Sequence, residues 1–60
     1  MLYNGTMRNE QARQLGFELT SYLERLKSLA KEAAATNASE AEALEIAVVN
    51  LNSAIDILTE

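Results

Sequence analysis

Apolar residues recur at helical spacing through the first half of the chain. They follow one another at alternating steps of three and four residues, namely Ala12, Leu15, Leu19, Tyr22, Leu26, Leu29 and Ala33. This heptad rhythm places them on one side of an α-helix and is typical of helices packed in a bundle. Leu23 and Ala30 lie beside the stripe and widen it. We therefore predict a helix over about residues 6–35, with Thr6 or Asn9 as its N-cap.

A second helix is predicted over about residues 40–59, with a stripe of its own: Ala41, Leu44, Val48, Leu51, Ile55 and Leu58. Continuing the first rhythm from Ala33 would place the next stripe position at Glu40 rather than at Ala41. One uninterrupted helix would therefore rotate its apolar side by about 100°. Ser39 and Glu42 also have the spacing of a capping box. Both observations predict a turn over residues 36–39.

The expected architecture is all-α, with an antiparallel two-helix hairpin that forms one domain over residues 1–60. Residues 1–5 are expected to be a non-helical lead, because Asn4-Gly5 is a turn dipeptide. A single bent helix or an extended coiled coil is the alternative, because the run from Lys31 to Ala35 is strongly helix-forming.

A hairpin of this kind leaves apolar residues without cover. The second helix is the shorter one and reaches back only to about Gly16. It also carries a second apolar stripe, and Phe17 lies opposite the stripe of the first helix. We predict that another subunit or partner covers Met7, Leu15, Phe17, Ile46, Val49 and Ile57. The simplest closure is a dimeric four-helix bundle with two-fold symmetry.

The composition supports association and argues against catalysis. The 60 residues include no cysteine, histidine, proline or tryptophan, and aromatic residues make up only 5%. This excludes a disulfide framework, a Cys/His zinc site and a histidine base. A single core of this size is marginally stable and usually needs partners. We therefore predict a non-enzymatic protein without a cofactor.

A metal site is not expected either. Glu42 and Glu45 lie one helical turn apart and are the closest carboxylate pair. The helix dipole favours acidic residues at the start of a helix, so this pair is explained without a metal ion.

Charge divides the chain into two unequal halves. The five basic residues all precede residue 36, whereas residues 37–60 carry only acidic ones: Glu40, Glu42, Glu45, Asp56 and Glu60. The chain offers no basic excess, so nucleic acid is not an expected partner. The acidic half suits a solvated helix face or a mimic of nucleic acid that binds a basic partner. Without a signal peptide or an apolar span, we expect the cytoplasm of the native or host cell and no membrane association.

Three functions follow from these patterns. The leading hypothesis is a small homo-oligomeric interaction or regulatory protein that binds a protein partner, such as a phage or bacterial inhibitor or adaptor. The first alternative is a protein that sequesters a small nucleotide-like anion at a subunit interface, with Tyr3, Arg8 and Arg13 as the binding residues. The second is the acidic mimic of nucleic acid.

Overall fold

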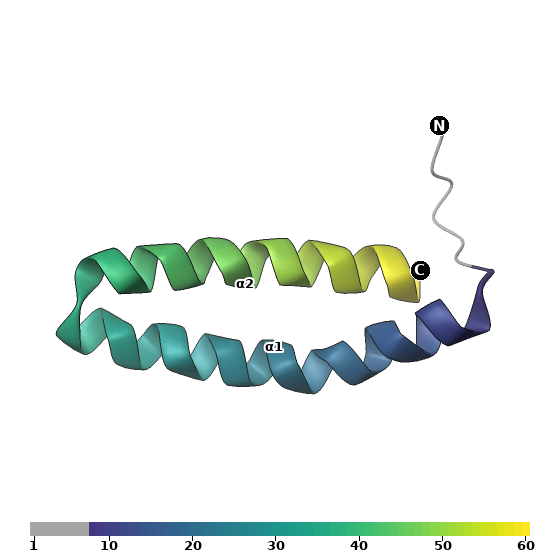
Figure 1. Ribbon diagram of the computed structural model, residues 1–60, viewed down its shortest axis with the longest axis horizontal. Coiled ribbons are helices and arrows are strands. Elements are labelled where there is room, and N and C mark those ends of the chain that lie inside the picture. Colours follow the sequence, from purple (N-terminus) through teal and green to yellow (C-terminus); the bar gives the residue numbers. More distant parts are fainter. Residues whose placement is uncertain (1–7) are drawn as a thin grey trace.

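The computed structural model describes residues 8–60, which form two antiparallel helices and no strand (Figure 1). Helix α1 spans Glu10–Thr36 and helix α2 spans Ala38–Thr59. The predicted hairpin is confirmed, and the alternative of a single bent helix is wrong. The predicted lead over residues 1–5 and the candidate cap Thr6 lie outside the described residues.

Helix α1 begins with a side-chain cap. The Asn9 Oδ1 atom accepts a hydrogen bond from the backbone N–H of Ala12 at 3.1 Å. This bond satisfies one of the N–H groups that have no partner in the first helical turn. Glu10 in the same turn adds a negative charge where the helix dipole favours one. Asn9 is thus confirmed as an N-cap, and the helix begins at residue 10 rather than near residue 6.

The connection between the helices consists of one residue, Asn37. Its backbone N–H donates to the carbonyl oxygen of Ala33 at 2.7 Å, and its Oδ1 accepts from the N–H of Glu40 at 3.1 Å. Asn37 therefore ends α1 and caps α2 from an extended backbone conformation, with φ −151° and ψ 101°. The predicted four-residue turn and the capping box at Ser39 are wrong, because Ser39 lies within the first turn of α2.

The contact between the helices is built mainly from small residues. The buried apolar side chains of the described residues are Leu23, Ala30, Ala33, Ala41 and Ile55, and none of them is fully buried. Gly16 is buried as well. Residues of this size bring two helix axes close together but remove little apolar surface from water. The core of one hairpin is therefore thin.

The side of α1 that faces α2 agrees with the predicted one only in part. Leu15, Tyr22 and Leu29 belong to the predicted stripe, yet they are 52%, 57% and 53% exposed. Leu23 and Ala30, predicted to widen the stripe, are buried, as is Ala33 within it, and Ala12, Leu19 and Leu26 are partly buried. The small residues of α1 allow the closest approach to α2, and this rotates the three larger side chains out of the contact.

The stripe predicted on α2 is confirmed. Ala41 and Ile55 are buried, and the other members are partly buried: Leu44, Val48, Leu51 and Leu58. The predicted reach of α2 is confirmed too, because a Cβ atom on Gly16 would lie 2.7 Å from the Cβ of Leu58. The chain end lies against the same turn of α1, where the Arg13 Nη1 atom donates to the carbonyl oxygen of Glu60 at 2.8 Å.

Candidate interaction surface

Six large apolar side chains from the two helices share one broad face of the hairpin. Tyr22 and Leu51 line one groove between the helices, and Leu29 and Leu44 line the groove that adjoins it. Leu58 lies against Gly16, the residue next to Leu15. On each helix these side chains are spaced seven residues apart, which keeps them on one side. We call this surface the heptad face: Leu15, Tyr22, Leu29, Leu44, Leu51 and Leu58.

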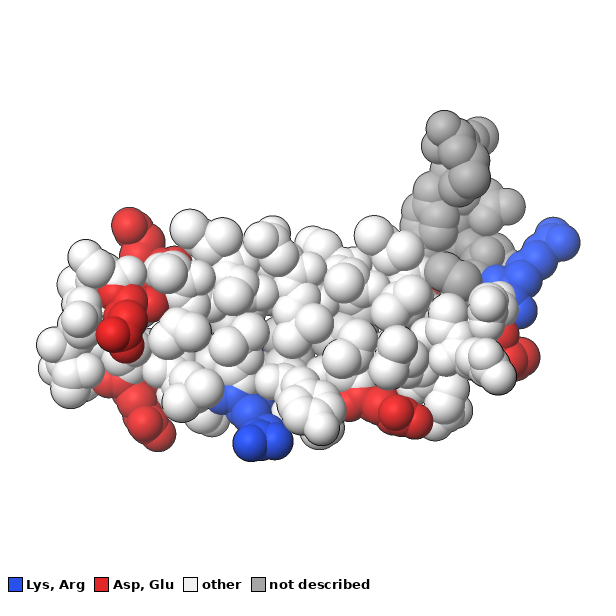
Figure 2. All heavy atoms as spheres, in the orientation of Figure 1, with Lys and Arg blue, Asp and Glu red and all other residues white. Residues whose placement is uncertain are grey.

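A broad face with few charged groups is visible directly in Figure 2. Uncharged residues cover the middle of both helices. On the face shown, acidic groups gather near the end that contains the turn, and both acidic and basic groups lie along the α1 edge and near the start of α1. Within the heptad face Leu15, Tyr22 and Leu29 are more than half exposed, and a group of large exposed apolar side chains marks a candidate interaction site.

Charged residues border the heptad face along α1. Glu18, Arg25 and Glu32 each follow a heptad-face residue of α1 by three positions. Glu18 accepts a hydrogen bond from Gln14 at 3.4 Å, and the Arg25 guanidinium lies 5.6 Å from the ring centre of Tyr22. None of the three forms an ion pair with another residue of the 8–60 range; the ion pair found there joins Glu24 and Lys27 at 3.5 Å.

The other predicted interface residues that the structure describes lie away from this face. Phe17 and Val49 are 54% and 63% exposed, and each is two positions from a heptad-face residue, which turns it by about 200° around its helix. Ile46 is 59% exposed and has the same offset from Leu44. Ile57 is 47% exposed, and Met7 lies outside the described residues. The prediction thus covers two surfaces, with only Leu15 on the heptad face.

Sequence reasoning missed five of the six heptad-face residues. It placed Tyr22 and Leu29 in the contact inside one hairpin, together with the three leucines of α2, which are partly buried there and also lie on the heptad face. The signal that would have found them is a second heptad on α1, formed by Gly16, Leu23 and Ala30. Its small members identify the side of closest helix approach.

The candidate anion-binding residues do not form a common site among the described residues. Tyr3 lies outside them, and Arg8 is exposed. Arg13 is engaged within the hairpin, because it donates to Glu60 and its guanidinium lies 5.8 Å from the ring centre of Phe17.

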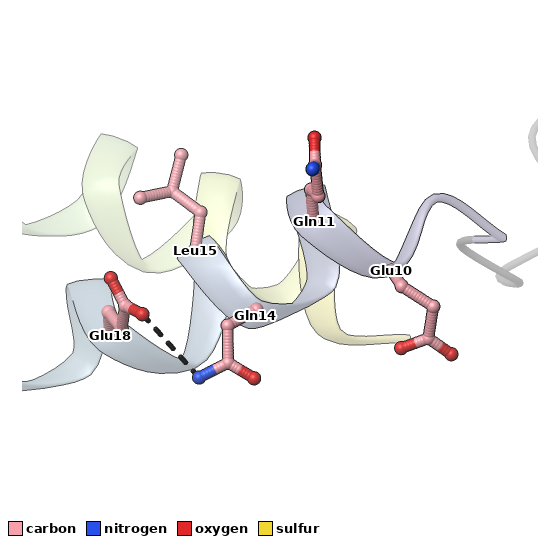
Figure 3. Close-up of a pocket in the computed structure, with 5 residues that line it drawn as sticks. All are labelled: Glu10, Gln11, Gln14, Leu15 and Glu18. Atoms are coloured by element: carbon pink, nitrogen blue, oxygen red, sulfur yellow. Dashed lines mark hydrogen bonds between the residues drawn. The ribbon is translucent and has the colours of Figure 1, made fainter.

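A hollow lies on the surface of α1 near its start, and neither arginine lines it. Figure 3 shows its lining residues: Glu10, Gln11, Gln14, Leu15 and Glu18. Glu18 and Gln14 point toward each other, and Leu15 projects from another side of the helix. Two carboxylates in this hollow disfavour an anionic ligand.

No metal centre or membrane span is found in the described part of the chain. No three acidic, histidine or cysteine side chains within residues 8–60 come close enough to hold a metal ion. Neither α1 nor α2 combines the length and the apolar content needed to cross a bilayer.

Comparisons of the chain with protein-family models, with curated proteins and with solved structures find no match.

Proposed function

We propose that this protein is a small non-enzymatic interaction or regulatory protein that works as a homo-oligomer, most simply as a dimeric four-helix bundle. One observation carries the proposal: the described residues expose more large apolar side chains than they bury. Among residues 8–60, Leu23 and Ile55 are the large apolar side chains that are buried. The exposed ones are Leu15, Phe17, Tyr22, Leu29, Ile46, Val49 and Ile57.

The heptad face approaches the size of a typical stable interface. Helix α2 has 22 residues, which corresponds to a length of ~33 Å, and two helices side by side are ~20 Å wide. The projected area of the face is therefore ~660 Å², without the additional surface of the protruding side chains. Stable interfaces bury about 800 Å² per partner. Covering this face with a second hairpin would also complete the thin core of each copy.

A second surface remains for a different macromolecule. Phe17 and Val49 point away from the heptad face, so a dimer formed through that face leaves both of them exposed. Aromatic residues are favoured anchors in protein interfaces. A role as a phage or bacterial inhibitor or adaptor, acting in the cytoplasm of the native or host cell, suits a small dimer with such a surface.

Sedimentation equilibrium tests the self-association. The chain has a mass of 6.6 kDa, so we expect a species of about 13 kDa at micromolar concentration. Leu29→Glu introduces a charge into the heptad face and is expected to give a folded monomer. Phe17→Glu is the matched control and is expected to stay dimeric. A wild-type protein that is folded and monomeric at 100 µM would contradict the proposal.

The acidic half of the chain favours a basic partner and supports mimicry of nucleic acid as a second candidate function. Glu42, Glu45 and Asp56 are all exposed on α2, and none of them has a basic residue within ion-pair distance among residues 8–60. A complex held by this surface is expected to weaken steeply between 50 and 500 mM salt (roughly 14 to 4 Å in screening length). The triple variant E42Q/E45Q/D56N should lose this salt dependence, whereas binding that is insensitive to salt contradicts the mimic.

A further inference from the structure

We propose that two hairpins pack through their heptad faces with α1 lying antiparallel on the partner's α1, and α2 on the partner's α2. The two-fold axis crosses the helices at Tyr22 and Leu51. This arrangement rests on the proposed self-association and specifies which residues meet across it.

The heptad face is symmetric about its own middle. Tyr22 and Leu51 lie at the same level, because they line one groove. Seven residues away on each helix, Leu29 and Leu44 line one groove at the turn end, and Leu58 lies against Gly16, the residue next to Leu15, at the other end. A two-fold axis through the middle therefore places each end pair of leucines on the opposite end pair of the second copy. Tyr22 and Leu51 meet their own counterparts.

Rotation about the same axis also brings opposite charges together along the edge of α1. Glu18 and Arg25 are seven residues apart, or about 10.5 Å along the helix, so they do not pair within one chain. Their midpoint lies within one residue of Tyr22, where the axis passes. Rotation about this axis brings Glu18 opposite the partner subunit's Arg25, and Arg25 opposite the partner subunit's Glu18. Two ion pairs thus close one edge of the interface.

The other two-fold packing, with α1 on the partner's α2, lacks this complementarity. The positions on α2 that correspond to Glu18 and Arg25 follow Leu44 and Leu51 by three residues, and they are Ala47 and Ala54. In that packing the charged edge of α1 would lie along uncharged alanines. In the packing proposed, the alanines of the two α2 helices meet each other and allow a close approach.

Cysteine cross-linking distinguishes the two packings, because the chain contains no cysteine of its own. Tyr22→Cys is expected to form a covalent dimer under mild oxidation, since Tyr22 faces its own counterpart on the axis. Leu51→Cys is expected to do the same. Phe17→Cys, on the other side of α1, is the control and is expected to remain uncross-linked. In the other packing, cross-links form only when the Tyr22→Cys and Leu51→Cys chains are mixed.

Charge reversal provides an independent test. Arg25→Glu replaces two attractive pairs by two repulsive ones and is expected to weaken dimerisation about tenfold. The double variant E18R/R25E restores the attraction and is expected to regain most of the wild-type affinity. Lys27→Glu is the matched control, because Lys27 pairs with Glu24 in its own chain, and it is expected to change the dimer affinity less than threefold.

The outcomes separate this arrangement from the function on which it rests. The packing is supported if the wild-type protein is a dimer, the Tyr22→Cys variant cross-links on its own, and E18R/R25E regains the dimer affinity that Arg25→Glu loses. If the wild-type protein is a dimer and cross-links form only when the Tyr22→Cys and Leu51→Cys chains are mixed, the packing is wrong but the self-association stands. A wild-type monomer overturns both.

Discussion

Gly16 of α1 lies directly against Leu58 of α2. A Cβ atom on Gly16 would come within 2.7 Å of the Leu58 Cβ and 2.9 Å of the Thr59 Cγ2, closer than non-bonded carbon atoms approach. The last turn of α2 therefore sits on the bare backbone of α1. Because Gly16 has no side chain, the end of α2 can approach the first half of α1 this closely.

Gly16→Ala should destabilise the hairpin although alanine is the better helix former. The helix propensity of alanine contributes about 1 kcal/mol of stability. The new Cβ atom, however, overlaps with the Cβ of Leu58, which cannot move without the backbone, so the end of α2 is pushed away at a cost of about 1–3 kcal/mol. We expect a net loss of stability in urea unfolding at fixed protein concentration. Thr20→Ala, at an exposed position of α1, is the control and should be neutral or slightly stabilising. Equal stabilisation by both substitutions would contradict the close approach.

Asn37 should be the most sensitive position in the turn. Asn37→Ala removes the Oδ1 acceptor for the Glu40 N–H and is expected to cost about 0.5–2 kcal/mol, while Asn37→Asp keeps the acceptor and most of the stability. Ser39→Ala is expected to change stability by less than about 0.5 kcal/mol, because Ser39 is an exposed residue inside α2. A larger effect at Ser39 than at Asn37 would show that the cap lies at Ser39.

Leu23 and Leu29 should have different effects when each is truncated. Leu23 is 4% exposed within one hairpin, so Leu23→Ala is expected to cost about 2–4 kcal/mol and to reduce helix content at every protein concentration. Leu29 is 53% exposed in the hairpin and lies on the heptad face. Leu29→Ala is expected to act mainly on association, with a loss of helix content that grows on dilution. Circular dichroism from 1 to 200 µM measures both. Identical concentration dependence for the two variants would assign Leu29 to the core of the hairpin.

Much of the fold follows from local patterns. The apolar spacing predicted both helices, and the shift in phase between Ala33 and Ala41 predicted that the chain reverses. Asn9 was predictable as a cap because capping depends on a side chain and an N–H group three residues apart. Each of these features involves residues that are neighbours in the sequence.

The candidate surface needed the tertiary structure. On α1, a stripe through Leu15 and Tyr22 and a stripe through Gly16 and Leu23 are both compatible with a helix, so periodicity alone does not say which one faces α2. Close approach of the two backbones decides between them, because only the side that carries Gly16 and Ala30 admits α2. The sequence by itself determined the two helices and their reversal. The packing of one helix on the other determined which leucines are left for a partner, since that depends on steric fit between residues far apart in the chain.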